Sequence, residues 1–305
     1  MKTSVAICTY NGGQFLKEQL ESVLEQSVQP DEIVICDDHS TDTTLEILAE
    51  YQKKHPEIFK IYKNQSSLGI IKNFEKAINL CQNDIVFLCD QDDLWNSDKV
   101  ETVLHYFKNN PGHKAVFHDL TLLENSSTLE YSNWETLFLN PQNTDGISIL
   151  HYLILFGNVA TGASFAFKNG RNKWNFNSSS QLFLHDYQLA VHFAAENTLG
   201  LINEKLGAYR IHASQQIGTS ENNRQKRKDI YDRFIKSSAL EKLRFYEEKS
   251  KNWQNRLNAD DAKKTLQFIQ KEMDPLKSKH LKNQPFIQRS CTRFYWEISK
   301  KFKIN

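Results

Sequence analysis

The sequence lacks the segments that would mark a membrane-spanning or secreted protein. No apolar run approaches the roughly 18 residues that a spanning helix needs, and the first residues have neither the basic nor the apolar zone of a secretion signal. The five cysteines form no C-x-x-C pair, and most of them lie in apolar runs. We therefore expect a cytoplasmic protein whose cysteines are reduced.

Two further absences narrow the class of ligand. The first apolar run is followed by Thr9-Tyr10-Asn11-Gly12-Gly13, not by the G-x-G-x-x-G turn that a dinucleotide pyrophosphate requires. This excludes an NAD-dependent dehydrogenase. The chain also has no RNP, zinc-ligand or helix-turn-helix pattern, so we expect no nucleic-acid partner.

Charge is distributed unevenly along the chain, although the formal net charge is only +1. Residues 1–221 carry 16 Lys and Arg against 27 Asp and Glu, whereas residues 222–305 carry 22 against 10. A division this steep indicates two segments with different surroundings. We predict a catalytic α/β domain over residues 1–221 and a basic helical region over residues 222–305.

The first segment alternates between strand and helix patterns. Apolar runs at residues 4–8, 32–36, 59–62 and 84–89 are typical of buried strands, and apolar residues at helical spacing separate them. Further strands are expected near residues 115–118 and 159–167, with a helix over 185–195. Strands joined by single helices predict a mostly parallel sheet flanked by helices.

Polar clusters follow two of these strands. Asp37-Asp38-His39-Ser40 follows the second, and Asp90-Gln91-Asp92-Asp93 follows the fourth. Open α/β sheets bind ligands at the carboxyl ends of their strands, so both clusters should line one crevice. Three carboxylates in four positions repel one another unless a cation neutralises them, which favours Mg²⁺ or Mn²⁺ carrying a diphosphate. The alternative is a solvated acidic turn.

In their order along the chain, these motifs resemble a family 2 glycosyltransferase of the GT-A fold. The residues concerned are 6–12, 36–42 and the D-x-D run at 90–93. Residues 67–74, 158–167, 185–190 and 209–212 are similar to a branch of rhamnosyltransferase-like proteins. The resemblance covers about residues 1–218 and leaves the tail outside it. The sequence departs from the family pattern at His39, where many relatives have a small residue.

The resemblance implies roles for particular residues. It places Thr9, Tyr10 and Asp38 around the donor's base and ribose, with Asp38 accepting the imide N–H, and Asp186 as the base that deprotonates the acceptor hydroxyl. Asp186 could instead cap the helix that begins there. The complete set that it implies for the donor is Thr9, Tyr10, Asn11, Asp38, Lys72, Asp90 and Arg210.

The metal and acceptor sides of the implied site leave alternatives open. Asp92 is the principal expected metal ligand, with Asp90 beside it, and His212 is either a further ligand or a structural histidine. Arg210 pairs with donor phosphate or forms a salt bridge. Asp93 either supports the metal ligands or lies on the acceptor side, and Trp95 either forms an acceptor-side wall or packs in the core.

The function implied is metal-dependent, inverting transfer of a sugar to an acceptor hydroxyl. The donor is L-rhamnose from dTDP-rhamnose or a UDP-hexose, and the acceptor is a saccharide or lipid-linked saccharide in bacterial polysaccharide assembly. A non-catalytic carbohydrate-binding protein of this fold is the rival. The basic, aromatic-containing segment 222–305 either contacts an anionic membrane surface on the cytoplasmic side or packs on the acidic domain.

Overall fold

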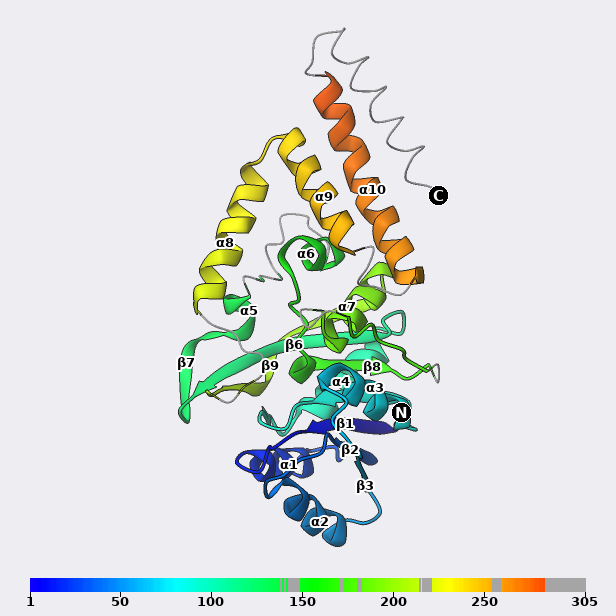
Figure 1. The fold of residues 1–305 in the computed structure, drawn as a ribbon, viewed down its shortest axis with the longest axis vertical. Helices are drawn as coiled ribbons and strands as arrows, with labels where there is room; N and C mark the ends of the chain where they lie inside the picture. The colour runs from blue at the N-terminus through cyan, green and yellow to red at the C-terminus, as the bar shows by residue number, and fades with distance from the viewer. Residues whose placement is uncertain are drawn as a thin grey trace. The chain divides into compact units, whose positions relative to one another are not determined.

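The computed structural model describes residues 1–137, 139, 141, 149–170, 173–179, 183–213, 215, 221–253 and 259–282. The chain divides into two compact units, Met1–Arg227 and Lys228–Asn305. Figure 1 shows the elements of both units. Cys291 and the aromatic residues of segment 283–305 lie outside the described residues.

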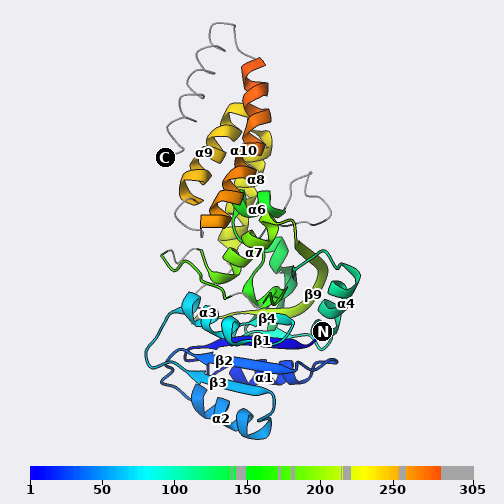
Figure 2. The same cartoon turned by 90° about the vertical axis from the view of Figure 1, so that its right-hand side faces the viewer.

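The first unit begins with four parallel strands in the spatial order β3-β2-β1-β4. They are β1 (Thr3–Thr9), β2 (Glu32–Asp37), β3 (Phe59–Lys63) and β4 (Ile85–Cys89). The helices between them are α1 (Leu16–Leu24), α2 (Thr44–Lys54) and α3 (Ile70–Leu80). Figure 2 shows α1 and α2 on one side of β1–β3 and α3 on the other. Right-handed crossovers produce this arrangement, because the chain reverses its direction across the sheet after β3.

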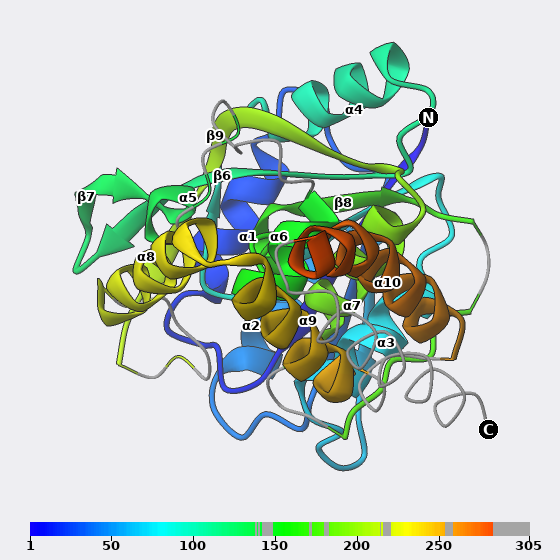
Figure 3. The ribbon, with the colours of Figure 1, turned by 90° about the horizontal axis from the view of Figure 1, so that it is seen from above.

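The second half of the sheet is mixed. Its order continues from β4 as β8-β6-β9-β5, with β7 beside β6. These strands are β5 (Leu94–Trp95), β6 (Ala115–Glu124), β7 (Ser127–Ser132), β8 (Phe165–Lys168) and β9 (Leu199–Ile211). β8 is antiparallel to both β4 and β6, whereas β6 and β9 run parallel, side by side in Figure 3. The predicted parallel pairing therefore holds among the first four strands. It fails at β8, because the chain does not reach its place beside β4 through a single crossover helix.

Further helices of the first unit lie between and beside these strands. They are α4 (Lys99–Asn109), α5 (Asn133–Thr136), α6 (Ile149–Phe156), a 3₁₀ turn at Gly162–Ser164, and α7 (His185–Ala195). Helix α5 has a capping box: the Ser132 side chain accepts from the Glu135 N–H, and the Glu135 carboxylate accepts from the Ser132 N–H.

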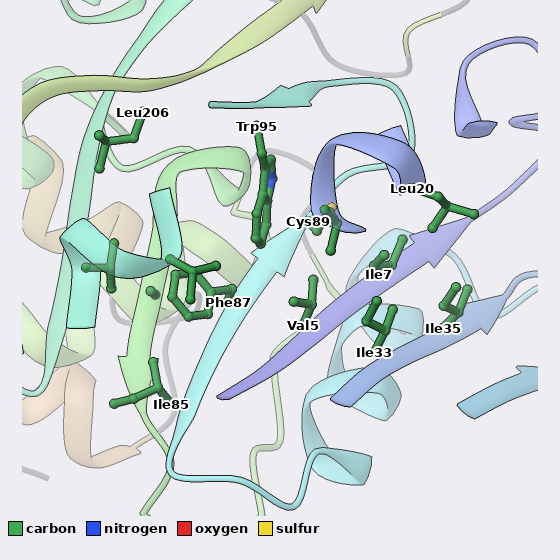
Figure 4. Packing of buried hydrophobic residues seen from close by; sticks show 14 of the residues in the cluster. Val5, Ile7, Leu20, Ile33, Ile35, Ile85, Phe87, Cys89, Trp95 and Leu206 are labelled. Carbon is green, nitrogen blue, oxygen red and sulfur yellow. The ribbon is translucent and has the colours of Figure 1, made fainter. Parts of the chain in front are cut away.

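The core lies on both faces of the parallel strands. Side chains of β1, β2 and β4 such as Val5, Ile35 and Phe87 are fully buried, and Figure 4 shows their packing around Cys89 and Trp95. Strands buried on both faces need continuous apolar runs, which is why the sequence marks them clearly. Cys8, Cys36, Cys81 and Cys89 are free thiols, as expected.

The C-terminal region is helical where it is described. Its helices are α8 (Glu221–Lys236), α9 (Ala239–Trp253) and α10 (Ala259–Lys282). Buried Phe234 contacts Tyr246 with ring centroids 5.9 Å apart, and Ile269 and Met273 of α10 are buried as well. Within the described part of the chain, no helix combines the length and the apolar character that crossing a bilayer requires.

Candidate active site

The ends of β1 and β2 are joined to each other by side-chain and backbone bonds. The Thr9 hydroxyl donates to Asp37 Oδ2 at 2.9 Å, and the Asp38 N–H donates to the Thr9 carbonyl at 2.8 Å. Thr9 therefore fixes the strand ends, while Tyr10 beside it is 44% exposed. Asn11 takes a positive φ of 48° and accepts from the Thr41 N–H through Oδ1, which brings the two loops together.

Asp38 is already saturated with protein donors. Its Oδ1 accepts from Asn64 Nδ2 and the Leu68 N–H, and its Oδ2 accepts from the Ser67 hydroxyl and the Gly69 N–H, at 2.7 to 2.9 Å. Burial raises the pKa of Asp38, but these four hydrogen bonds outweigh it and lower the pKa. A carboxylate has about four acceptor positions, and protein donors occupy four on Asp38, so the bond from Asp38 to the imide of a base stays a prediction that would require one of these donors to be displaced. Asp38 shapes the loop before α3.

Two other positions near this loop also differ from what the motifs suggest. The Lys72 ammonium forms an ion pair with Glu75 at 2.7 Å and donates to the Phe176 carbonyl at 2.9 Å. Lys72 therefore ties α3 to segment 173–179 and is already engaged at the place where donor binding is predicted. His39 adopts φ +70°, a backbone conformation that glycine adopts more readily than other residues.

The acidic cluster after β4 brings together residues that are distant in the sequence. Asp92 Oδ2 lies 2.9 Å from His212 Nε2, and the two side chains are 17% and 16% exposed. Burial first, and then the charges of Asp92 and Asp186, raise the pKa of Asp90 to about 7. Gln91, between the two aspartates, accepts from the Tyr10 N–H and donates to the Tyr10 carbonyl, which joins this loop to the end of β1.

Arg210 forms a salt bridge, which was one of its two predicted alternatives. Its Nη2 lies 2.7 Å from Glu18 Oε2, its Nε donates to the Asp92 carbonyl at 2.8 Å, and the guanidinium lies over the Phe15 ring. The Arg210 side chain is only 8% exposed, whereas that of Glu18 is 59% exposed, so the pair lies at the edge of the protein surface. Arg210 therefore holds the acidic loop in place through the Asp92 carbonyl. These contacts do not indicate that Arg210 binds a donor phosphate.

The two residues predicted on the acceptor side are both buried. Asp93 is 2% exposed and accepts from the Arg210 N–H, and burial, followed by the charges of Asp92 and Asp90, raises its pKa. Trp95 is 6% exposed, belongs to the apolar core and lies under the Lys99 ammonium, which is 3.9 Å from the ring centroid. Trp95 therefore takes its core-packing alternative, and an acceptor-side role for Asp93 stays a prediction.

Asp186 is the second residue of α7, and the N-cap position belongs to Leu184. Its Oδ2 accepts from Asn158 Nδ2 and from the Gly162 N–H, both at 3.0 Å. Its Oδ1 accepts from the Tyr187 N–H at 2.7 Å. Burial raises the pKa of Asp186 to about 6 in spite of these bonds. The capping alternative is therefore not realised, and a carboxylate with this pKa ionises close to neutrality, as a general base should.

Some contributing residues gave no signal in the sequence. Lys99 is 1% exposed and donates to the Ala163 carbonyl at 2.7 Å, so it places a buried cation near Asp90 and Asp93. Lysine side chains are rarely fully buried, so the sequence did not predict this role for Lys99. A Cβ on Gly162 would lie 3.6 Å from Asp90 Oδ2 and 3.8 Å from Asp186 Cβ, so both predicted carboxylates border this glycine.

The residues present fit a divalent cation only in part. Asp92 and His212 offer an oxygen and a nitrogen ligand side by side, and burial first, with neighbouring carboxylates second, raises the pKa values of Asp90 and Asp93. Among the residues that the structure describes, however, no group of three or more His, Cys, Asp or Glu is arranged around a common point. A cation held here would need further oxygen ligands from a bound molecule.

The fold that carries this site is the GT-A fold of glycosyltransferases. The structure superposes on Staphylococcus aureus TarS 1-349 in complex with UDP-GlcNAc with a TM-score of 0.56 and 17% identity, over 87% of this chain and 69% of that one. It also resembles the mannosyltransferase PcManGT from Pyrobaculum calidifontis in complex with GDP-Man and Mn²⁺, with a TM-score of 0.51 and 15% identity, over 98% and 80% of the two chains.

Sequence comparison finds a family match over the first part of the chain. Residues 4–150, slightly less than half of the chain, match the model of Glycosyl transferase family 2, which supports the predicted glycosyltransferase enzyme. A dTDP-rhamnosyl transferase of Shigella flexneri, RfbG, is 26% identical over 70% of this chain and 74% of its own length. An uncharacterised protein of Mycobacterium tuberculosis is 28% identical over 39% of this chain, and the match spans only about a third of that relative, 35% of its length.

Proposed function

We propose that the protein transfers a sugar from a nucleoside diphosphate sugar to an acceptor hydroxyl with inversion at the anomeric carbon. One observation carries the proposal: Asp90 of the acidic cluster after β4 and Asp186 of α7 both border Gly162, although they are far apart in the sequence. The repelling carboxylates of Asp90 and Asp92 lie where a donor with its cation would bind. Asp186, a separate carboxylate with a raised pKa, lies beside them.

Each residue then has a distinct task. Asp186, held by Asn158 and Gly162, accepts the proton of the acceptor hydroxyl as that oxygen attacks. Asp92 and His212 would hold Mg²⁺ or Mn²⁺ together with the donor's diphosphate, and the cation would stabilise the charge of the leaving nucleoside diphosphate. Exposed Tyr10, held by Gln91, is available to stack on the base.

For the donor we propose dTDP-rhamnose, because the similarity to RfbG extends over most of both chains. A UDP-hexose is the alternative, and the fold shared with TarS in its UDP-GlcNAc complex supports testing it. The proposed acceptor is a saccharide or lipid-linked saccharide of the bacterial cell surface. Contact of segment 222–305 with an anionic membrane stays a prediction, since residues 283–305 lie outside the described part of the chain.

The test measures binding and turnover separately in two carboxylate-to-amide variants. We expect UDP or dTDP to raise the melting temperature most when Mn²⁺ is present, because a bound nucleotide stabilises the fold by mass action. Asp92→Asn should lose the Mn²⁺-dependent part of that shift, whereas Asp186→Asn should keep it and lose transfer. Glu46→Gln, on the exposed face of α2, is the control. Equal loss of nucleotide affinity in the Asp92 and Asp186 variants would contradict the proposed roles.

A further inference from the structure

His185 is a buried polar residue in the first turn of α7. It is 2% exposed, and neither Nδ1 nor Nε2 has a hydrogen-bond partner among the residues that the structure describes. Its ring is stacked on Phe74, with centroids 3.8 Å apart and an interplanar angle of 13°, and is tilted against Phe176. Burial lowers its pKa to about 3, so the ring is neutral, with one N–H donor and one acceptor nitrogen.

An unpartnered ring of this kind requires an explanation. Leaving a buried polar group unsatisfied is costly, and almost all such groups in folded proteins have a partner. A phenyl ring would stack equally well on Phe74 without that cost. A hydrogen bond from a His185 ring nitrogen to a bound molecule would remove this cost.

The space beside His185 lies within the candidate active site. A Cβ built on Gly162 would lie 3.5 Å from His185 Nε2, 3.6 Å from Asp90 Oδ2 and 3.8 Å from Asp186 Cβ. These are ordinary van der Waals contacts, so the missing side chain leaves room for an atom between the three residues. The histidine edge, the carboxylate beside the proposed metal ligand and the proposed base thus border the same small space.

We propose that His185 hydrogen-bonds a hydroxyl of the donor's sugar, and that Gly162 provides the space for that part of the sugar. This rests on the proposed function. A neutral imidazole offers a donor and an acceptor, which matches a hydroxyl group that both donates and accepts. The flanking carboxylates Asp90 and Asp186 disfavour an anionic sugar. The site therefore selects a neutral, hydroxyl-bearing hexose and rejects a uronic acid.

The experiment compares the affinity for a nucleotide with the affinity for the corresponding sugar nucleotide. The probes are dTDP with dTDP-rhamnose, and UDP with UDP-glucose and UDP-glucuronate, each with Mn²⁺, measured by calorimetry. His185→Phe keeps the ring, its burial and its stacking. We expect unchanged affinity for dTDP or UDP, affinity for the neutral sugar nucleotide reduced about tenfold, and a melting temperature at or above that of the wild type.

Two further variants make the result specific. Gly162→Ala fills the space with a methyl group at permitted distances, so it should fold normally, keep nucleotide affinity and lose affinity for the sugar nucleotide. His185→Gln restores an amide donor and acceptor and should recover part of what His185→Phe loses. A purely structural histidine would give no such recovery and would instead change stability.

The outcomes separate this inference from the proposed function. If His185→Phe binds the sugar nucleotide as the wild type does, or if nucleotide and sugar nucleotide lose affinity equally, the inference is overturned. Tighter binding of UDP-glucuronate than of UDP-glucose would also overturn it. If the wild type binds the sugar in a His185-dependent manner but transfers it to no acceptor, the proposed function fails while the inference stands.

Discussion

The proposed base can be tested through the residue that holds it. Asn158 Nδ2 donates to Asp186 Oδ2 at 3.0 Å and thereby stabilises the ionised carboxylate. A hydrogen bond to a charged group contributes about 1.5 to 3 kcal/mol, and one pKa unit corresponds to about 1.4 kcal/mol. Asn158→Ala should therefore raise the pKa of Asp186 by at least about one unit, from about 6 to about 7.

The sign of the effect on activity follows from the role of the base. Asp186 must be ionised to accept a proton, so kcat/KM falls as the pH falls through its pKa. At pH 6 the ionised fraction should drop from about one half to about one tenth in Asn158→Ala, a loss of roughly fivefold. Above about pH 8.5 the variant and the wild type should converge. The assay is the pH profile of kcat/KM between pH 5 and 9.

Neighbouring carboxyl groups are controlled for by the choice of variants. The pKa of Asp90 is also near 7. The Asn158 amide, however, is bonded to Asp186, so a shift of the acidic side of the kcat/KM profile in an Asn158 variant reports on Asp186. Asn158→Asp keeps the acceptor for the Ala160 N–H and places a charge beside Asp186, so it should move the limb further. Asn83→Ala, at the opposite ends of the strands, is the control. An acid limb that stays in place in both Asn158 variants would refute Asp186 as the base.

Two other predictions concern buried charges. Asp38→Asn should destabilise the fold by about 2 to 4 kcal/mol in urea denaturation, because an amide nitrogen would face two of the four donors that Asp38 now satisfies. Because the pKa of Asp38 is lowered, the stabilisation by its carboxylate is present above about pH 4 and is lost as the pH falls through the pKa of the folded state. If Asp38→Asn loses nucleotide affinity without losing stability, Asp38 is instead a direct ligand. Lys99→Met should cost about 3 to 5 kcal/mol at pH 7.5, because it leaves Asp90 and Asp93 without their buried cation, and less at pH 5.5, where Asp90, whose pKa is about 7, is protonated. A cost in urea denaturation that does not depend on pH would contradict this electrostatic role of Lys99.

The acidic site illustrates how strongly the fold alters the meaning of a motif. Asp90, Asp92 and Asp93 are near neighbours in the sequence, yet Asp92 faces His212, Asp93 is buried under the Arg210 backbone, and Asp90 borders Gly162. Adjacent residues of a loop point in different directions, so one carboxylate reaches a ligand while the next supports the loop. The roles within a D-x-D run therefore depend on the strands that pack around it.

The sequence by itself determined the parallel half of the sheet. The apolar runs of β1, β2 and β4 and the helical spacing between them are local patterns, and they predicted the boundaries of these elements within a few residues. Its resemblance to family 2 glycosyltransferases also led to the prediction that Asp90, Asp92 and Asp186 belong to one site, and the family match covers the first two of these residues.

Only the tertiary structure decided the antiparallel insertion of β8, the buried cation of Lys99, the saturation of Asp38 and the partnerless ring of His185. The physical reason is the same in each case. Burial, pairing and unmet hydrogen bonds are properties of contacts between distant segments, and a pattern within one segment does not contain them.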